Sequence, residues 1–201
     1  MKIQFDKKYL NNLNIFDLHS RCTGISKRYF RLEAGKEPYR LLYYLTNLFN
    51  DSKIIDLGTS NGASALALSA NKTNQIYSFD IIDRCETSFL QNENSFEKAP
   101  SFQNVDFIVT QDFTKYIDLF LKSPFIYLDI AHDGIWENIL LDLLTKNNYK
   151  GIMVLDDIHA FPEMEILWNK LTFNKVDITS YGHWSGTGLI DFSNKIEFEL
   201  L

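Results

Sequence analysis

The sequence has few of the features that mark secreted or membrane-embedded proteins. Its 201 residues include only two cysteines, Cys22 and Cys85, which is too few for a disulfide framework, and they form no C-x-x-C pair. No apolar run approaches the roughly 20 residues that a membrane-spanning helix needs. The charged start of the chain, with Lys2, Lys7 and Lys8, does not resemble a signal peptide. We therefore expect a cytoplasmic protein with no membrane partner.

Positive charge is also scarce. The chain has 20 Lys and Arg against 26 Asp and Glu, so its formal net charge is −6. Binding of nucleic acid usually requires clustered basic residues, and the one such cluster, residues 27–31, is short. His19 and Cys22 have a spacing seen in metal sites, but no further ligands accompany them. The composition thus argues against a nucleic-acid partner.

The chain is rich in apolar and aromatic residues. Hydrophobic residues make up 45% of the sequence and aromatic residues 14%, a balance typical of globular proteins. There is no repeat and no Pro- or Gly-rich linker. The length predicts one domain over residues 1–201, with residues 1–50 as a helical N-terminal cover and residues 51–201 as the core.

From residue 53 onward, short β-branched or aromatic runs alternate with amphipathic stretches, which is the pattern of a parallel sheet. The last two runs have no helical pattern between them and should pair antiparallel. The expected strands are residues 53–57, 75–81, 105–110, 125–130, 151–156, 175–180 and 188–192. The expected helices are residues 7–13, 38–49, 63–70, 113–121, 136–145 and 163–171, with a polar helix reaching residue 97 and Pro38 in a first helical turn. The predicted fold class is α/β, a Rossmann-like seven-stranded, mostly parallel sheet with an antiparallel C-terminal hairpin.

The turn that follows the first of these strands is rich in small residues. Gly58 and Gly62 allow the backbone to turn sharply from strand to helix and allow a ligand to approach closely. The free N–H groups of the following helix attract an anion. Ligands of open α/β sheets bind beyond the carboxyl ends of the strands, where this turn lies.

Three kinds of ligand or reaction suit this turn. A dinucleotide site is disfavoured because Ser60 and Ala63 interrupt the G-x-G-x-x-G pattern. A serine hydrolase is possible in principle, since Gly58-x-Ser60-x-Gly62 fits the nucleophile elbow G-x-S-x-G. That fold, however, builds several strands before its serine, whereas this turn follows the first strand. The third ligand is a nucleoside that carries an amino-acid tail.

For such a nucleoside, each strand end offers a suitable group. Asp56 lies where an ammonium group could bind, and the loop amides suit a carboxylate. Asp80, at the end of the second strand, can accept hydrogen bonds from both ribose hydroxyls. Asp112 and Phe113, after the third strand, suit the edge and the face of an adenine. A nucleoside-binding protein without catalysis has the same features.

These residues resemble the class I S-adenosylmethionine (SAM)-dependent methyltransferases. Asp56-x-Gly58-x-x-x-Gly62 matches their first motif, Asp80 their ribose-binding acid and Asp112 their adenine-side acid. Ser64 matches a serine that helps to hold the methionine carboxylate in catechol-type enzymes. The resemblance implies these cofactor-binding residues: Asp56, Gly58, Thr59, Ser60, Gly62, Ser64, Asp80, Ile81, Asp112 and Phe113.

A second group of acidic residues follows the next two strands. Asp129 ends the fourth strand, and Asp156 and Asp157 end the fifth. Carboxylates gathered at one sheet edge repel one another unless a cation neutralises them, and an all-oxygen set favours a hard ion such as Mg²⁺. Neighbouring strand residues point to opposite faces, so Asp156 and Asp157 can bind one ion only if the chain turns there.

This group resembles the metal site of the metal-dependent O-methyltransferases of the macrolide-sugar and catechol types. The resemblance implies Asp129, Asp156 and Asp157 as metal ligands and His132, three residues after Asp129, as the base. No lysine occurs between Lys122 and Lys146 to serve as a catechol-type base, which favours the sugar or aliphatic-hydroxyl branch. The expected activity is SAM-dependent methylation of a hydroxyl on a small molecule such as a sugar, with Mg²⁺ or another divalent cation.

The remaining histidines and the tryptophans are assigned less specific roles. We expect His159 and His183 to have structural or supporting functions. Trp136, Trp168 and Trp184 are expected to pack in the interior, although Trp184, in a Gly-rich segment, could also line a pocket.

Overall fold

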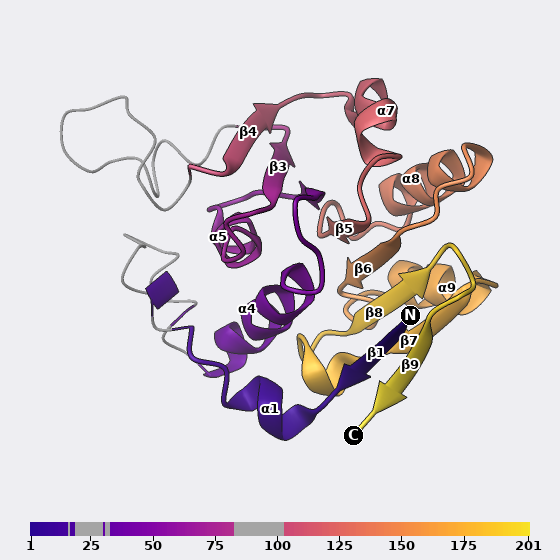
Figure 1. Ribbon diagram of the computed structural model, residues 1–201. Coiled ribbons are helices and arrows are strands. Elements are labelled where there is room, and N and C mark those ends of the chain that lie inside the picture. The colour runs from indigo at the N-terminus through magenta and orange to yellow at the C-terminus, as the bar shows by residue number, and fades with distance from the viewer. Residues whose placement is uncertain (16, 19–29, 31–32, 83–102) are drawn as a thin grey trace.

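The computed structural model describes residues 1–15, 17–18, 30, 33–82 and 103–201 (Figure 1). Four features predicted from the sequence lie outside these ranges. They are the helix that reaches residue 97, the basic residues 27–31, the pair His19 and Cys22, and Cys85.

A seven-stranded sheet forms the centre of the molecule, in the order β4-β3-β2-β5-β6-β8-β7. β8 runs antiparallel to both of its neighbours, and the other pairs are parallel. The predicted fold class and the antiparallel C-terminal hairpin are therefore confirmed. The strands are β2 (Lys53–Leu57), β3 (Gln75–Asp80), β4 (Val105–Val109), β5 (Phe125–Leu128), β6 (Ile152–Asp156), β7 (Asn174–Asp177) and β8 (Thr187–Asp191).

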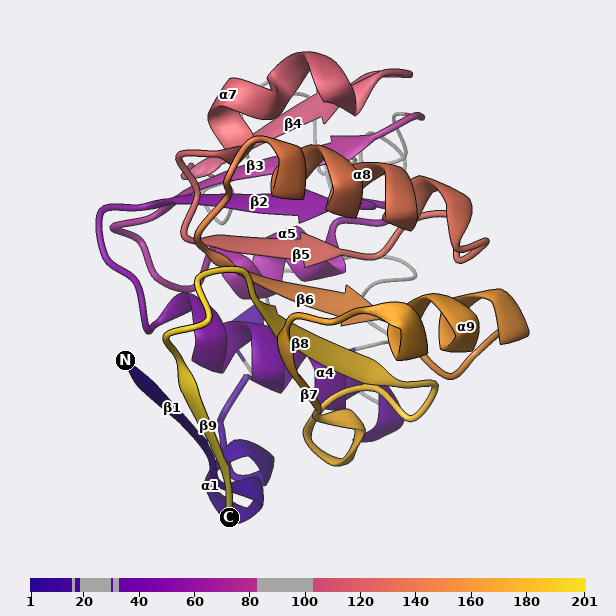
Figure 2. The ribbon, with the colours of Figure 1, turned by 90° about the vertical axis from the view of Figure 1, so that its right-hand side faces the viewer.

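Helices cover both faces of this sheet. α8 and α9 lie on one face, and α4 and α5 lie on the other (Figure 2). No helix in the described ranges is long and apolar enough to cross a bilayer. The helical elements are α1 (Lys7–Asn11), α4 (Glu33–Thr46), α5 (Ala63–Leu68), η2 (Phe113–Tyr116), α7 (Ile117–Phe120), α8 (Ile135–Lys146), α9 (Pro162–Lys170) and η3 (Thr179–Tyr181).

Along each strand, side chains point alternately to the two faces of the sheet, and this produces two hydrophobic cores, one on each face. Ile54 and Val154 belong to the core under α4 and α5, whereas Ile55 and Leu155 belong to the core under α8 and α9. Because both faces of the sheet are buried, these strands consist of continuous apolar runs. The same alternation directs Asp56 and Asp156 to the α4/α5 side.

The N-terminal region differs from its prediction in two ways. α4 begins at Glu33 and contains Pro38, so Pro38 is not in its first turn. The buried leucines Leu41 and Leu45 anchor α4 in the core, and such packing supplies most of the stability of a helix in a protein.

The second difference is a small additional sheet. β1 (Lys2–Phe5) pairs in parallel with β9 (Glu197–Leu200), so the first and last segments of the chain lie side by side (Figure 1). Ile3 and Phe5 alternate with exposed residues and are fully buried in the α4/α5 core. The N-terminal cover is thus not purely helical.

We expect the β1–β9 sheet to contribute to the stability of the whole fold. Phe5 has no exposed surface and packs against the rings of Tyr44 and Tyr181. Phe5→Ala should lower the free energy of unfolding by about 3–5 kcal/mol, the usual cost of emptying such a site. Lys2→Ala, on the exposed side of the same strand, is the matched control and should leave the urea midpoint almost unchanged. A loss below about 1 kcal/mol in Phe5→Ala would show that the terminal strands are an appendage.

Candidate functional site

The turn between β2 and α5 requires glycine at its first position. Gly58 has φ +101°, and a Cβ there would lie 1.6 Å from the carbonyl oxygen of Asp129. The N–H groups of Gly58 and Thr59 donate to the Phe79 carbonyl, which ties the turn to β3. Ser60 and Gly62 also have positive φ values, 45° and 75°. The turn therefore lies directly against the end of β5, with room for no side chain between them.

A cavity of about 510 Å³ opens beside this turn at the carboxyl ends of β2, β3 and β5. Asp80 lines it, and one of its carboxylate oxygens accepts from the Ser60 N–H at 2.7 Å. Thr110, Gln111 and Phe113 form the far wall. Of the predicted cofactor-binding residues, the structure brings these together around this cavity: Gly58, Ser60, Asp80, Ile81 and Phe113.

Asp112 lies outside the lining of this cavity. Its carboxylate accepts from the Thr114 N–H at 3.1 Å and lies 3.7 Å from the Lys115 ammonium, so it caps the short helix η2. Trp136, which was expected to be internal, has 44% of its surface exposed and lines the cavity. Trp184 is also exposed, at 73%, whereas Trp168 is buried as predicted.

Asp56 lies beneath the turn with none of its surface exposed. One oxygen, Oδ2, accepts from the hydroxyls of Ser78 at 2.6 Å and Ser64 at 3.0 Å. The other, Oδ1, has no hydrogen-bond partner among the described residues. Burial raises the pKa of Asp56 to about 7, against the smaller opposing effect of the two serine hydroxyls.

A smaller cavity of about 210 Å³ lies on the other side of the turn. It shares Gly58, Ser60 and Asp129 with the larger cavity, so the two are adjacent. Thr59, Ser64, Tyr39 of α4, Tyr127, Asp156 and His183 complete its wall. Residues 38 and 39 of α4 therefore cover part of this edge, as expected of the N-terminal region.

Three residues of the predicted carboxylate–histidine cluster, Asp129, His132 and Asp157, lie together where these cavities adjoin, and Asp156 falls in a second group. His132 Nε2 lies 2.8 Å from Asp129 Oδ1 and 3.5 Å from Asp157 Oδ2. The ligand atoms of these three residues all lie within 4.8 Å of one another. The His132 N–H donates to the buried Glu137 carboxylate at 2.7 Å, and the His132 ring stacks on Phe161. His132 is thus fixed from both sides.

Asp156, Asp157 and His183 form a second group within the same distance limit. The chain turns at Asp157, which has φ +57°, so both carboxylates reach this edge of the sheet. The chain therefore makes the turn that Asp156 and Asp157 need in order to bind one ion together. The Tyr127 hydroxyl donates to Asp156 Oδ2 at 3.0 Å and lies 3.3 Å from Asp129 Oδ2. Tyr127 thus links the carboxylates of β5 and β6.

The adjacent carboxyl groups of Asp156 and Asp157 have pKa values that are shifted in opposite directions. Burial, followed by the charges of Asp129 and Asp157, raises the pKa of Asp156 to about 7. Burial alone would also raise the pKa of Asp157, but hydrogen bonds from His183 and Ser185 lower it. The hydrogen bond to Asp129 raises the pKa of His132 to about 9. Without a metal, the protonated His132 ring therefore compensates part of the negative charge of these carboxylates.

Sequence reasoning missed three side chains of this site. Tyr127 precedes Asp129 by two residues and so shares its face of the sheet, a signal that the alternation of β5 already contained. His183 and Ser185 reach Asp157 because β8 folds back beside β6, and no pattern in the sequence gives that register.

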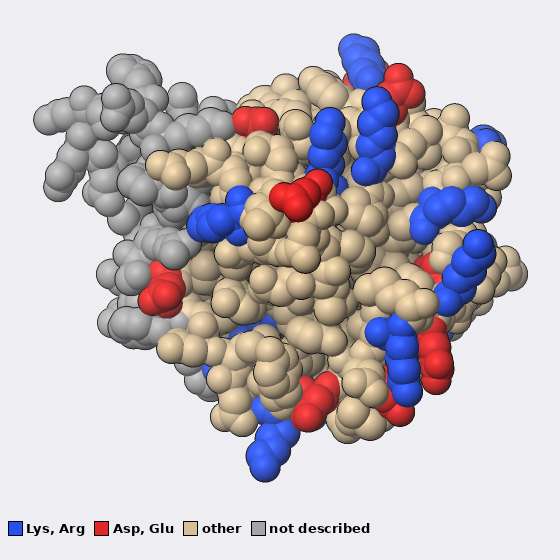
Figure 3. Space-filling view, in the orientation of Figure 1, with Lys and Arg blue, Asp and Glu red and all other residues tan. Residues whose placement is uncertain are grey.

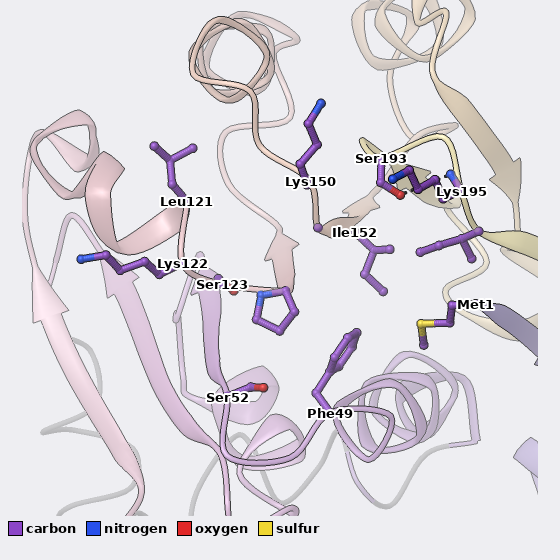
Figure 4. A pocket seen from close by; sticks show the side chains of 13 residues that line it. Met1, Phe49, Ser52, Leu121, Lys122, Ser123, Lys150, Ile152, Ser193 and Lys195 are labelled. Atoms are coloured by element: carbon purple, nitrogen blue, oxygen red, sulfur yellow. Dashed lines mark hydrogen bonds between the residues drawn. The ribbon is translucent and has the colours of Figure 1, made fainter.

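A further hollow of about 580 Å³ lies at the opposite edge of the sheet, beside Ser52, Pro124 and Gly151 at the amino ends of three strands (Figure 4). Lys122 and Lys150 stand on its rim and point away from one another in this view, so they do not converge on a ligand. On the face shown in Figure 3, basic side chains are interspersed with acidic and uncharged ones and form no continuous basic surface.

Comparisons with known proteins identify the fold. A scan against protein-family models and a search of curated proteins found no match. Among solved structures, a putative caffeoyl-CoA O-methyltransferase from Staphylococcus aureus is similar, with a TM-score of 0.57 and 14% identity over 92% of this chain and 98% of that one. The chain has a methyltransferase fold.

Two further structures support this fold assignment. SAH-bound methyltransferase PaMTH1 from Podospora anserina has a TM-score of 0.56 and 13% identity, over 94% of this chain and 97% of that one. The O-methyltransferase TomG from Streptomyces achromogenes, in complex with SAM, has a TM-score of 0.52 and 12% identity, over 92% and 96%. The methyltransferase fold therefore accounts for most of the chain, and at these identities the likeness concerns the fold alone.

The adjacent residues Asp156 and Asp157 should affect stability with opposite signs in metal-free protein. The pKa of Asp156 lies above its ordinary value of 3.8, so its contribution is fully present below that value and is lost as the pH rises through about 7. Asp156→Asn stays neutral and should gain stability over the wild type from pH 5 to pH 8, by a few kcal/mol at most. Asp157→Asn should lose stability at both values, because the pKa of Asp157 is lowered and its ionised form stabilises the fold.

Urea unfolding curves in excess chelator, at pH 5 and pH 8, measure both differences. Equal destabilisation by the two variants at pH 8 would show that burial places no cost on the Asp156 charge.

Proposed function

We propose that this protein is a SAM-dependent O-methyltransferase that acts on a hydroxyl of a small molecule with the help of a divalent cation. One observation carries the proposal. Asp129 lines the larger cavity beside the glycine turn and also belongs to the carboxylate–histidine cluster. A cofactor in that cavity and an ion on that cluster would thus both lie beside Asp129. Methyl transfer requires the methyl donor and the acceptor hydroxyl to be held this close together.

The larger cavity suits the adenosyl part of SAM. The Asp80 carboxylate accepts hydrogen bonds from three backbone N–H groups, those of Ser60 and Ile81 at 2.7 Å and that of Ile82 at 3.2 Å. Its oxygens can exchange these for ribose hydroxyls. Phe113 and Gln111 offer an aromatic face and an amide to the base. SAM supplies an electrophilic methyl group.

The space beneath the turn suits the methionine part. Asp56 has a buried oxygen that lacks a partner, and such an oxygen is stabilised by a cationic donor. Ser64 stands between Asp56 and the smaller cavity, where its hydroxyl can bind either the carboxyl or the ammonium group. Thr59 and Ser60, also at this cavity, would hold the same end of the cofactor.

Asp129, Asp156 and Asp157 would hold the divalent cation. The donor set fits, because it concentrates carboxylates and leaves Asp156 Oδ1 buried without a partner. A bound cation lowers the pKa of a hydroxyl and so prepares it as a nucleophile. Tyr127 positions Asp129 and Asp156 through its hydroxyl.

His132 would take the proton of the acceptor hydroxyl. With a pKa of about 9 the ring is protonated at neutral pH as long as Asp129 retains its full negative charge. Neutralising that charge brings the imidazole towards its ordinary pKa, at which it can accept a proton. Glu137 and Phe161 hold the ring in place meanwhile.

A small hydroxylated acceptor, such as a sugar, fits the remaining features. The similar structures include a putative caffeoyl-CoA O-methyltransferase and an O-methyltransferase involved in tomaymycin synthesis, and both names refer to small molecules. The segment between Lys122 and Lys146 has no lysine to act as a catechol-type base. The histidine in this position favours an aliphatic hydroxyl.

The hydrolase alternative has less support. Ser60 has the positive φ of a nucleophile elbow, but its turn follows β2, the first strand of the seven-stranded sheet. His132 Nε2 hydrogen-bonds to Asp129, so this nitrogen is engaged by a carboxylate. Labelling of Ser60 by a fluorophosphonate would revive this alternative. Binding of SAM without turnover on any hydroxylated compound would instead indicate a nucleoside-binding protein.

Cofactor binding should depend on Asp80. Calorimetry with S-adenosylhomocysteine should give a Kd that Asp80→Ala raises at least about tenfold, since each lost hydrogen bond to a charged group is worth about 1.5–3 kcal/mol. Asp142→Ala, on the exposed side of α8, is the control and should bind like the wild type. Equal affinity in Asp80→Ala and the control would remove Asp80 from the site.

Turnover should depend on the cation and on His132 separately. Excess chelator, and likewise Asp129→Asn, should abolish methyl transfer while the methyl donor still binds. His132→Ala should lower kcat by about 10²–10⁴-fold, the usual loss when a general base is removed. Full activity in chelator would refute the metal requirement, and full activity in His132→Ala would assign proton removal to the cation or solvent.

A further inference from the structure

His183 is placed to bind the same cation. Its Nδ1 lies 2.6 Å from Ser185 Oγ and 3.4 Å from Asp157 Oδ1, so a cation bound by Nδ1 would replace the contact with Ser185. The ligand atoms of Asp156, Asp157 and His183 all lie within 4.8 Å of one another. His183 and Asp156 both line the smaller cavity, so an ion there would be accessible from it.

An independent observation points to a missing ligand in this group. Asp156 has only 6% of its surface exposed, and its Oδ1 has no hydrogen-bond partner among the described residues. A buried, unpartnered carboxylate oxygen is costly, and native proteins normally satisfy such an atom. Its other oxygen is already bound by Tyr127, so the free one is available to a cation.

The fold holds His183 in this position before any ion binds. The His183 N–H donates to the Thr187 hydroxyl at 2.7 Å at the start of β8. Beyond it, the N–H groups of Ile158 and His159 donate to the carbonyls of Gly186 and Ser185, which ties this loop to the end of β6. A Cβ at Gly186 would lie 2.5 Å from the His159 nitrogen, so the approach of the two segments is close.

We propose that His183, together with Asp156 and Asp157, binds the divalent cation, and that the site therefore selects a later transition ion such as Co²⁺ over Mg²⁺. The inference rests on the metal-binding part of the proposed function and does not need the methyl donor. Mg²⁺ strongly prefers oxygen ligands, whereas imidazole suits the later first-row ions, from Fe²⁺ to Zn²⁺. One nitrogen among carboxylates thus changes which ion binds best.

Titration of the wild-type protein with Co²⁺, followed by its visible absorption, tests this directly. We expect saturable binding that an equal concentration of Mg²⁺ does not displace. His183→Gln should weaken Co²⁺ binding at least tenfold, while weak Mg²⁺ binding, measured by competition, should change little. His159→Gln is the matched control, because His159 lies on the neighbouring loop that follows β6, pairs with Asp177 at 2.7 Å and is outside the cluster.

Unfolding curves of both variants establish that they are folded. Should His183→Gln not fold, pulsed EPR of Mn²⁺ on the wild-type protein replaces it. A directly bound imidazole nitrogen that persists in His132→Gln supports the proposal, and its absence overturns it.

Two results overturn the proposal while leaving the proposed function intact. They are equal Co²⁺ affinity in His183→Gln and the wild type, and Mg²⁺ binding as tight as that of Co²⁺. A third result would support the metal proposal while contradicting the methyltransferase proposal. If Co²⁺ binds through His183 but S-adenosylhomocysteine does not bind, the metal site stands and the methyltransferase proposal fails.

Discussion

The contact between Gly58 and the backbone of Asp129 is the constraint on which the rest of the site depends. The Asp129 N–H donates to the Leu57 carbonyl at 2.9 Å, and no side chain fits between Gly58 and the Asp129 carbonyl. This close approach brings the glycine turn of β2 against the strand end that carries the first carboxylate of the cluster. The two adjacent cavities share residues because of it. A larger residue at position 58 would separate the two parts of the site.

Electrostatic compensation is the second requirement of this arrangement. Asp56, Asp129, Asp156 and Asp157 all lie at one edge of the sheet, and two of them are almost fully buried. Hydroxyl groups of Tyr127, Ser78 and Ser185 satisfy some of their oxygens, and His132, whose pKa is raised to about 9, supplies positive charge. Two buried oxygens, Asp56 Oδ1 and Asp156 Oδ1, keep no partner among the described residues. The site therefore offers a buried carboxylate oxygen to a cationic group at two points, Asp56 and Asp156.

The sequence predicted the parts of the structure that depend on local patterns. Apolar runs gave the strands of the main sheet, the glycine spacing gave the turn, and the acids at strand ends placed Asp80 at one cavity and Asp129 at both. The contribution of His183 could not be predicted, because it depends on the pairing of β8 with β6. The β1–β9 pairing was not predicted, because it joins residues at the two ends of the chain. The prediction that a helix begins at Pro38 was wrong, because packing of α4 on the core outweighs the tendency of proline to interrupt a helix.

The central claim is that one edge of the sheet binds SAM and a divalent cation side by side. The most direct test is a crystal structure of the protein grown with S-adenosylhomocysteine and Mn²⁺, with anomalous data for the metal. The account predicts adenosyl density between Asp80 and Phe113, and an anomalous peak beside Asp156 and Asp157. Nucleoside density in another cavity, or a metal peak away from these carboxylates, would contradict it.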